Sequence, residues 1–146
     1  MYCLHRLLHP EIFQGKHKTK KDYFEGWYFK IIDTGQQAPL AVIPGVSYQK
    51  DGRDAHAFIQ VMDARHGHAH YFRFPLSAFR ASEDTFEVWI GENYFCRNEI
   101  RLNIDTDRGR FTGRLRFDHI VPFPKTVTNP GIMGPFTFIP WMECYH

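Results

Sequence analysis

The sequence contains few cysteines, and their spacing excludes one common use of that residue. The three cysteines lie at positions 3, 96 and 144. They are odd in number and lack the close pairs that form a zinc site. Reduced thiols are the simplest interpretation, and we therefore expect a cytoplasmic protein.

Net charge and long apolar runs are lacking as well. A formal charge of +2 is too small to indicate a nucleic acid partner, and the short basic run at 16–21 is typical of a solvated loop. No apolar run approaches the roughly 20 residues that span a bilayer. Residues 1–10 contain two histidines and an arginine without the apolar core of a signal peptide. The sequence predicts a soluble protein.

Aromatic residues are present in excess. They make up 16% of the 146 residues, with 14 Phe, 7 Tyr and 3 Trp, in a chain that is 43% hydrophobic. A chain of this length forms one domain with a real core. Aromatic rings pack well on pleated sheets and also line pockets for long apolar ligands. Both uses are open at this point.

Residues 23–30 (YFEGWYFK) are the most informative stretch of the chain. Aromatic and β-branched residues favour an extended strand here. With a period of two, Glu25 shares one face with Tyr23, Trp27 and Phe29, whereas Tyr28 lies on the other face. A carboxylate in a row of rings costs free energy when buried, unless it is protonated, hydrogen-bonded or paired. Glu25 is therefore a candidate for chemistry.

Short extended segments separated by turn signals follow along the whole chain. The predicted strands are 23–32, 40–48 (with a bulge or kink at Pro44), 56–63, 69–74, 86–90, 93–97, 100–105 and 110–119, and a short helix or turn is possible over 76–81. Turn signals about every ten residues indicate an antiparallel barrel, half-barrel or sandwich rather than βαβ units. The expected fold is all-β with little helix.

The two ends of the chain differ from this pattern. Residues 1–22 read as a polar lead-in, and 122–135 as a loop rich in Pro and Gly. The chain then ends within a run of aromatics that contains Trp141, Glu143 and His146. Because termini are usually polar, we expect that the chain continues naturally or that this end docks into a sheet.

Several motifs together resemble the tocopherol cyclase family and its bacterial relatives. They are His9-Pro10 with FQG at 13–15, YFEGWYFK at 23–30, IPG at 43–45, HAFIQ at 56–60, PGIMG at 130–134 and PWMECYH at 140–146. The resemblance covers essentially the whole chain. It implies a lipocalin-like (calycin-like) β architecture and, for complete members, closure of a chromanol ring from a prenylated quinol. Those members are longer, so 1–146 is expected to be the N-terminal part of a two-part protein.

Ring closure of this kind needs a proton donor in a dry aromatic setting. A carboxyl group whose pKa is raised by an apolar environment can protonate an alkene, and π faces stabilise the resulting cation. Glu25 and Glu143 each supply a carboxyl group between aromatic residues, and His56 or His146 could orient either of them. The expected ligand-binding residues are Trp27, Tyr28, Phe29, Phe58 and Trp141.

Plainer interpretations stand beside these. Glu25 and Glu143 could be solvated or paired with arginine, and Trp27 and Trp141 could be core residues. The alternating His66, His68 and His70 could present imidazoles to a metal, but the glycine between the first two indicates a turn, so neither a metal nor a cofactor is expected.

Three functions remain open for the whole chain. The first is binding of an isoprenoid or quinol-like molecule, with proton-initiated cyclisation in the complete protein. The second is a non-catalytic lipid carrier, and the third is a half-domain that assembles with a partner or with a second copy as a homo-oligomer. The expected partner is an apolar small molecule, collected through peripheral membrane contact, and no nucleic acid.

Overall fold

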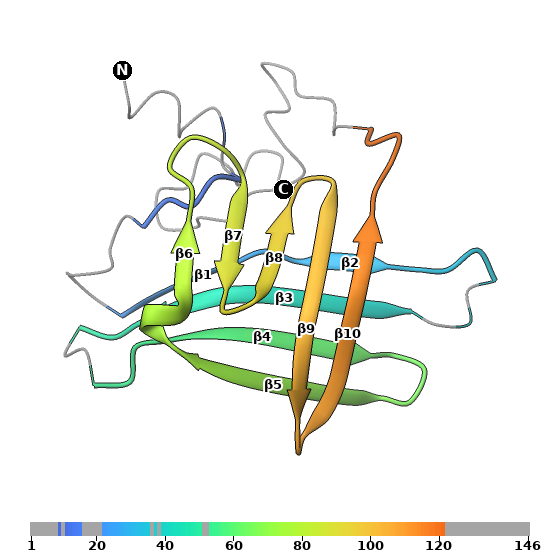
Figure 1. Ribbon diagram of the computed structural model, residues 1–146, viewed down its shortest axis with the longest axis horizontal. Coiled ribbons are helices and arrows are strands. Elements are labelled where there is room, and N and C mark those ends of the chain that lie inside the picture. Colours follow the sequence, from blue (N-terminus) through green and yellow to red (C-terminus); the bar gives the residue numbers. More distant parts are fainter. Residues whose placement is uncertain are drawn as a thin grey trace, which may run out of the picture.

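The computed structural model describes residues 9, 11–15, 22–35, 37, 39–50 and 53–121, which form two antiparallel sheets of five strands each. The strands of one sheet run across those of the other (Figure 1). The first sheet contains β1 (Tyr23–Gly26), β2 (Phe29–Ile31), β3 (Leu40–Tyr48), β4 (His56–Asp63) and β5 (His68–Pro75). The second contains β6 (Phe79–Ala81), β7 (Glu87–Ile90), β8 (Asn93–Cys96), β9 (Glu99–Thr106) and β10 (Gly109–Arg116). In the described part of the chain, the sheets are not closed into a barrel, so the predicted all-β fold is confirmed in its half-barrel or sandwich form.

The predicted strand 23–32 is divided into β1 and β2, and the cause lies in the neighbouring strand. Both pieces pair with β3 in one register, from Tyr23 opposite Tyr48 to Ile31 opposite Leu40. This register brings Trp27 opposite Pro44, whose carbonyl accepts the Trp27 amide at 3.0 Å. Because Pro44 has no N–H to return, the ladder is interrupted there. The bulge expected within β3 is absent, since β3 pairs with β4 residue by residue.

The core lies between the two sheets and follows the alternation read from the sequence. Ala57, Ile59 and Val61 of β4 are fully buried, as expected of the small aliphatic face of that strand. From the other sheet, Val88, Ile90, Phe95, Ile100 and Ile104 pack in the same cluster. At roughly 1.5–3 kcal/mol for each large apolar side chain buried, this interface supplies most of the driving force for folding.

A short 3₁₀ turn, Leu76–Ala78, carries the chain from β5 to β6 and so from the first sheet to the second. It lies at the start of the possible helix over 76–81, but the following residues become β6. Among the described residues, no helix is long and apolar enough to cross a membrane. The predicted loop at 122–135 and the aromatic end at 136–146 lie outside the described residues.

Candidate functional site

The structure distributes the predicted site residues over two faces of the first sheet. Exposure alternates along 23–31 as the period of two predicts, so Glu25, Trp27 and Phe29 face inward and Tyr28 faces solvent. The pairing places Phe58 and His56 on the outer face with Tyr28. The predicted residues Trp141, Glu143 and His146 lie outside the described residues. The described candidates therefore do not line one cavity.

Glu25 is held by three hydrogen-bond donors. The backbone amide of Gln14 donates to Oε1 at 2.7 Å, and the amide of Gly15 donates to Oε2 at 3.0 Å. The Tyr23 hydroxyl donates to Oε2 at 2.5 Å. Gly15 has a φ of 56°, a conformation that L side chains rarely adopt, and this turn aims its amide at the carboxylate. In this arrangement both carboxylate oxygens accept hydrogen bonds and anchor the lead-in segment.

Trp27 and Phe29 are packed by rings from other elements. The Trp27 ring stacks on Phe86 with centroids 5.6 Å apart and lies 6.4 Å from Phe13. Phe29 stacks on Phe86 at 6.0 Å and on Phe117 at 6.2 Å. The indole N–H of Trp27 donates to the carbonyl of Glu11 at 2.8 Å. These contacts join the lead-in segment to both sheets.

A cleft of about 380 Å³ lies beside this aromatic cluster. One wall comes from the lead-in segment and the other from β7, β8 and the turns that flank them. The lining residues are His9, Glu11, Ile12, Asp84, Thr85, Phe86, Glu87, Tyr94, Cys96, Arg97 and Asn98. Since Phe86 and Glu11 both contact Trp27, the cleft adjoins the aromatic wall that the sequence predicts.

One carboxylate of the cleft is bound to a phenol. The Tyr94 hydroxyl donates to Glu87 at 2.7 Å, and the Thr85 hydroxyl donates to the other Glu87 oxygen at 2.9 Å. These bonds, led by that of Tyr94, lower the pKa of Glu87, so Glu87 is ionised at neutral pH. Burial, followed by the bond to Glu87, raises the pKa of Tyr94. Tyr94 is therefore a fixed donor that keeps its proton.

A second carboxylate of the cleft orients an imidazole. Nδ1 of His9 lies 3.1 Å from Oε1 of Glu11, and both side chains are about half exposed. Because the carboxylate accepts the Nδ1 proton, the pair resembles the carboxylate–imidazole units that move protons in enzymes. The cleft is thus lined by two hydrogen-bonded pairs that carry protons, Glu87 with Tyr94 and His9 with Glu11. Phe86 and Ile12 give the same cleft its apolar surface.

The outer face of the first sheet carries a separate network around His56. Its Nδ1 lies 2.7 Å from the Asp54 carbonyl oxygen and 3.2 Å from Nη2 of Arg73, and its Nε2 lies 2.9 Å from the Tyr71 hydroxyl. The guanidinium of Arg73 bonds the Asp54 carboxylate and holds its pKa low. Phe58 stacks on Tyr71 at 5.2 Å. These residues lie apart from the lining of the cleft.

Sequence reasoning missed the cleft residues Glu87 and Tyr94. A signal was present, because the predicted hairpin 86–97 turns at Gly91-Glu92 and places these two residues on one face of neighbouring strands. His9 and Glu11 had no comparable signal, since the lead-in segment has no regular period. No three His, Cys, Asp or Glu side chains of the described part could hold a metal ion, His66, His68 and His70 included.

Comparison with known proteins adds no relative. No family model, no curated protein and no solved structure matches the chain.

Proposed function

We propose that the chain binds a largely apolar molecule with a hydroxylated ring, of the prenylated quinol class, in the cleft beside Phe86. The observation that carries the proposal is the cleft itself, which combines an aromatic floor with two proton-carrying pairs. Its volume of about 380 Å³ is within the usual range of small-molecule sites. One residue of the motifs that resemble the tocopherol cyclase family, His9, lies in its lead-in wall.

The polar groups suit a phenolic head. Ionised Glu87 accepts a hydrogen bond from a ligand hydroxyl, while Tyr94 keeps that carboxylate in place. The His9–Glu11 pair faces the same space and can accept a proton from a phenol. Phe86 and Ile12 offer apolar contact to the ring and the first part of the chain.

In the complete protein we propose proton-initiated cyclisation of this ligand. A carboxylic acid, for which the sequence offers Glu143, gives its proton to one alkene carbon. The phenol oxygen then bonds to the tertiary cation, and the phenol proton leaves to a base. His9 lines the cleft and is our candidate for that base, with its ring held by the hydrogen bond to the Glu11 carboxylate. Glu25 serves this scheme by positioning the lead-in wall, since its oxygens accept three bonds.

The same contacts favour a second candidate, a carrier of the same ligand without catalysis. Both oxygens of Glu25 are occupied as acceptors from three donors that fix its position, which suits a structural role. Incubation of the full chain with a short-chain prenylated hydroquinone separates the two functions. Formation of the cyclic ether supports the cyclase, whereas saturable binding without product supports the carrier.

Binding is tested with the same hydroquinone and two matched variants. Tyr94→Phe removes the hydroxyl at the cleft and Tyr71→Phe removes one on the outer face. Loss of one hydrogen-bonding group costs about 1 kcal/mol, so we expect Tyr94→Phe to weaken binding by about fivefold. Tyr71→Phe should bind as the unaltered chain does. Equal affinity for all three proteins would remove the cleft as the site.

A further inference from the structure

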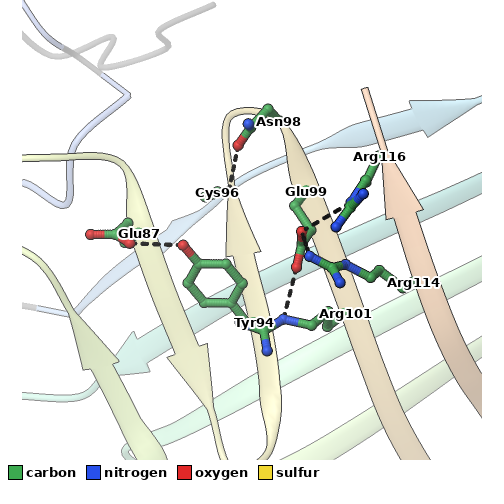
Figure 2. A network of polar contacts seen from close by, with 8 residues as sticks. All are labelled: Glu87, Tyr94, Cys96, Asn98, Glu99, Arg101, Arg114 and Arg116. Carbon is green, nitrogen blue, oxygen red and sulfur yellow. Dashed lines mark hydrogen bonds and ion pairs between the residues drawn. The ribbon is translucent and has the colours of Figure 1, made fainter. Parts of the chain in front are cut away.

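Three arginines of the second sheet converge on one carboxylate, on the face turned away from the core (Figure 2). We call Arg101, Arg114 and Arg116 the arginine cluster. Nε of Arg101 lies 2.8 Å from Oε1 of Glu99, Nη2 of Arg114 bonds Oε2, and Nε of Arg116 lies 3.7 Å from Oε2. Glu99 and Arg101 come from β9, and the other two arginines come from β10.

Charge and exposure show that the carboxylate lies beneath the guanidinium groups. The Glu99 side chain is 12% exposed, whereas those of Arg101, Arg114 and Arg116 are 53%, 50% and 65% exposed. The hydrogen bond from Arg114 lowers the pKa of Glu99, which is therefore ionised at neutral pH. One negative charge against three positive charges leaves an excess of two on the solvent side.

The strand register brings two of these positive charges close together, and the single carboxylate of Glu99 offsets them only in part. Arg101 lies directly opposite Arg114, and like charges at such a position destabilise a sheet. The Tyr94 ring holds the Arg101 guanidinium 4.5 Å from its centroid, so this side chain has little freedom to move away. Other carboxylates on this face are engaged elsewhere, because Glu87 is bonded to Tyr94 and Thr85, and Glu92 accepts a hydrogen bond from Asn103.

We propose that the arginine cluster binds a phosphate group. Each guanidinium has five N–H donors in a planar fork, and Glu99 occupies a minority of those available. Forks of this kind bind phosphate oxygens in pairs, and a phosphate monoester carries about the charge that the cluster has in excess. Glu99 acts as a positioning residue, because it draws the three side chains to one point.

Isothermal titration with inorganic phosphate tests the site on the full chain. The Arg114→Gln/Arg116→Gln double variant removes two of the guanidinium groups. Arg110→Gln is the matched control, since Arg110 lies on the same face of β10 and pairs with Asp105 at 3.5 Å outside the cluster. We expect saturable binding that the double variant weakens by at least about tenfold and the control leaves unchanged.

Two further measurements distinguish a phosphate site from a general effect of salt. Sodium chloride at matched ionic strength should not reproduce the effect, and phosphate should raise the melting temperature of the unaltered chain but not of the folded double variant. The proposal is overturned if the double variant binds phosphate as tightly as the unaltered chain. It is also overturned if the unaltered chain shows neither saturable phosphate binding nor vesicle binding.

The source of the phosphate is separated with vesicles. Sedimentation with vesicles of phosphatidic acid in phosphatidylcholine, lost in the double variant and competed by inorganic phosphate, assigns the cluster to a lipid headgroup. Phosphate binding without vesicle binding assigns it to a soluble phosphate compound. Neither result depends on the quinol proposed for the cleft, because Arg114 and Arg116 do not line that cleft.

Discussion

Removal of the Glu25 carboxylate should detach residues 11–15 from the first sheet and lower the stability of the protein. Glu25→Ala removes the carboxylate that accepts hydrogen bonds from the amides of Gln14 and Gly15 and from the Tyr23 hydroxyl. Gln14 itself is buried, so water replaces the lost acceptor poorly. The perturbation therefore acts at a junction between the lead-in segment and β1.

The magnitude follows from the three bonds. Hydrogen bonds to a charged group contribute about 1.5–3 kcal/mol each in favourable settings. Glu25 is partly exposed, so water recovers a share, and we expect a loss of about 3 kcal/mol for Glu25→Ala. Glu25→Gln should cost about 2 kcal/mol, because its amide N–H₂ meets donors where the second oxygen was.

Urea unfolding followed by circular dichroism measures this loss. With a slope of about 2 kcal/mol per M, Glu25→Ala should lower the midpoint by about 1.5 M. Hydrogen exchange at the Gln14 and Gly15 amides should accelerate in the same variant. Tyr23→Phe removes one of the three bonds, and Tyr28→Phe on the outer face is its matched control with an expected change under about 0.5 kcal/mol.

A catalytic role for Glu25 and a positioning role predict different results for the same variants. A catalytic acid at Glu25 predicts that Glu25→Gln abolishes turnover while the urea midpoint and the affinity for ligand stay unchanged. Positioning by Glu25 predicts a lower midpoint and weaker ligand binding together, because the lead-in wall of the cleft depends on it. An unchanged midpoint for both Glu25 variants would refute the positioning role.

Three further outcomes are expected. Gly45→Ala should cost at least about 2 kcal/mol by thermal unfolding, since its Cβ would lie 2.8 Å from a backbone oxygen and against the Phe58 ring, and Phe58→Leu should relieve part of the loss. Ile59→Ala in the fully buried core should cost about 2–5 kcal/mol in the same measurement. The hydrogen bond from Arg114 lowers the pKa of Glu99 below its ordinary value of 4.5. Ionised Glu99 therefore stabilises the folded chain above pH 4.5, and this stability is lost as the pH falls through the folded-state pKa. Glu99→Gln should make the free energy of unfolding less dependent on pH in this acid range.

The sheet could be predicted where alternation and turn signals agree. Residues 56–63 were expected as a strand with Ala57, Ile59 and Val61 packed inward, and β4 has those limits and those buried residues. The break between β1 and β2 could not be read from 23–32, because its cause is the missing N–H of Pro44 on a paired strand. Register between strands is a tertiary property, so a local pattern does not contain it.

The candidate site was predictable only in part, because the local pattern gives the face of a residue and not its partners. The face of Glu25 followed from its period, but its partners did not, since Gln14 and Gly15 belong to a segment without a regular pattern. Phe58 and Trp27 were both expected to bind the ligand. The pairing of β1 with β3 and of β3 with β4 instead places them on opposite faces.

The walls of the cleft are held in place by residues that do not line it. Its lead-in wall is tied to the first sheet through Glu25 and through the bond from the Trp27 indole to Glu11. Its other wall belongs to the second sheet, and the ring of Phe86 joins the two by stacking on Trp27. The two walls of the cleft are therefore joined by contacts of residues 11–15 with both sheets, so a change at Glu25 or Trp27 should alter the cleft although neither residue lines it.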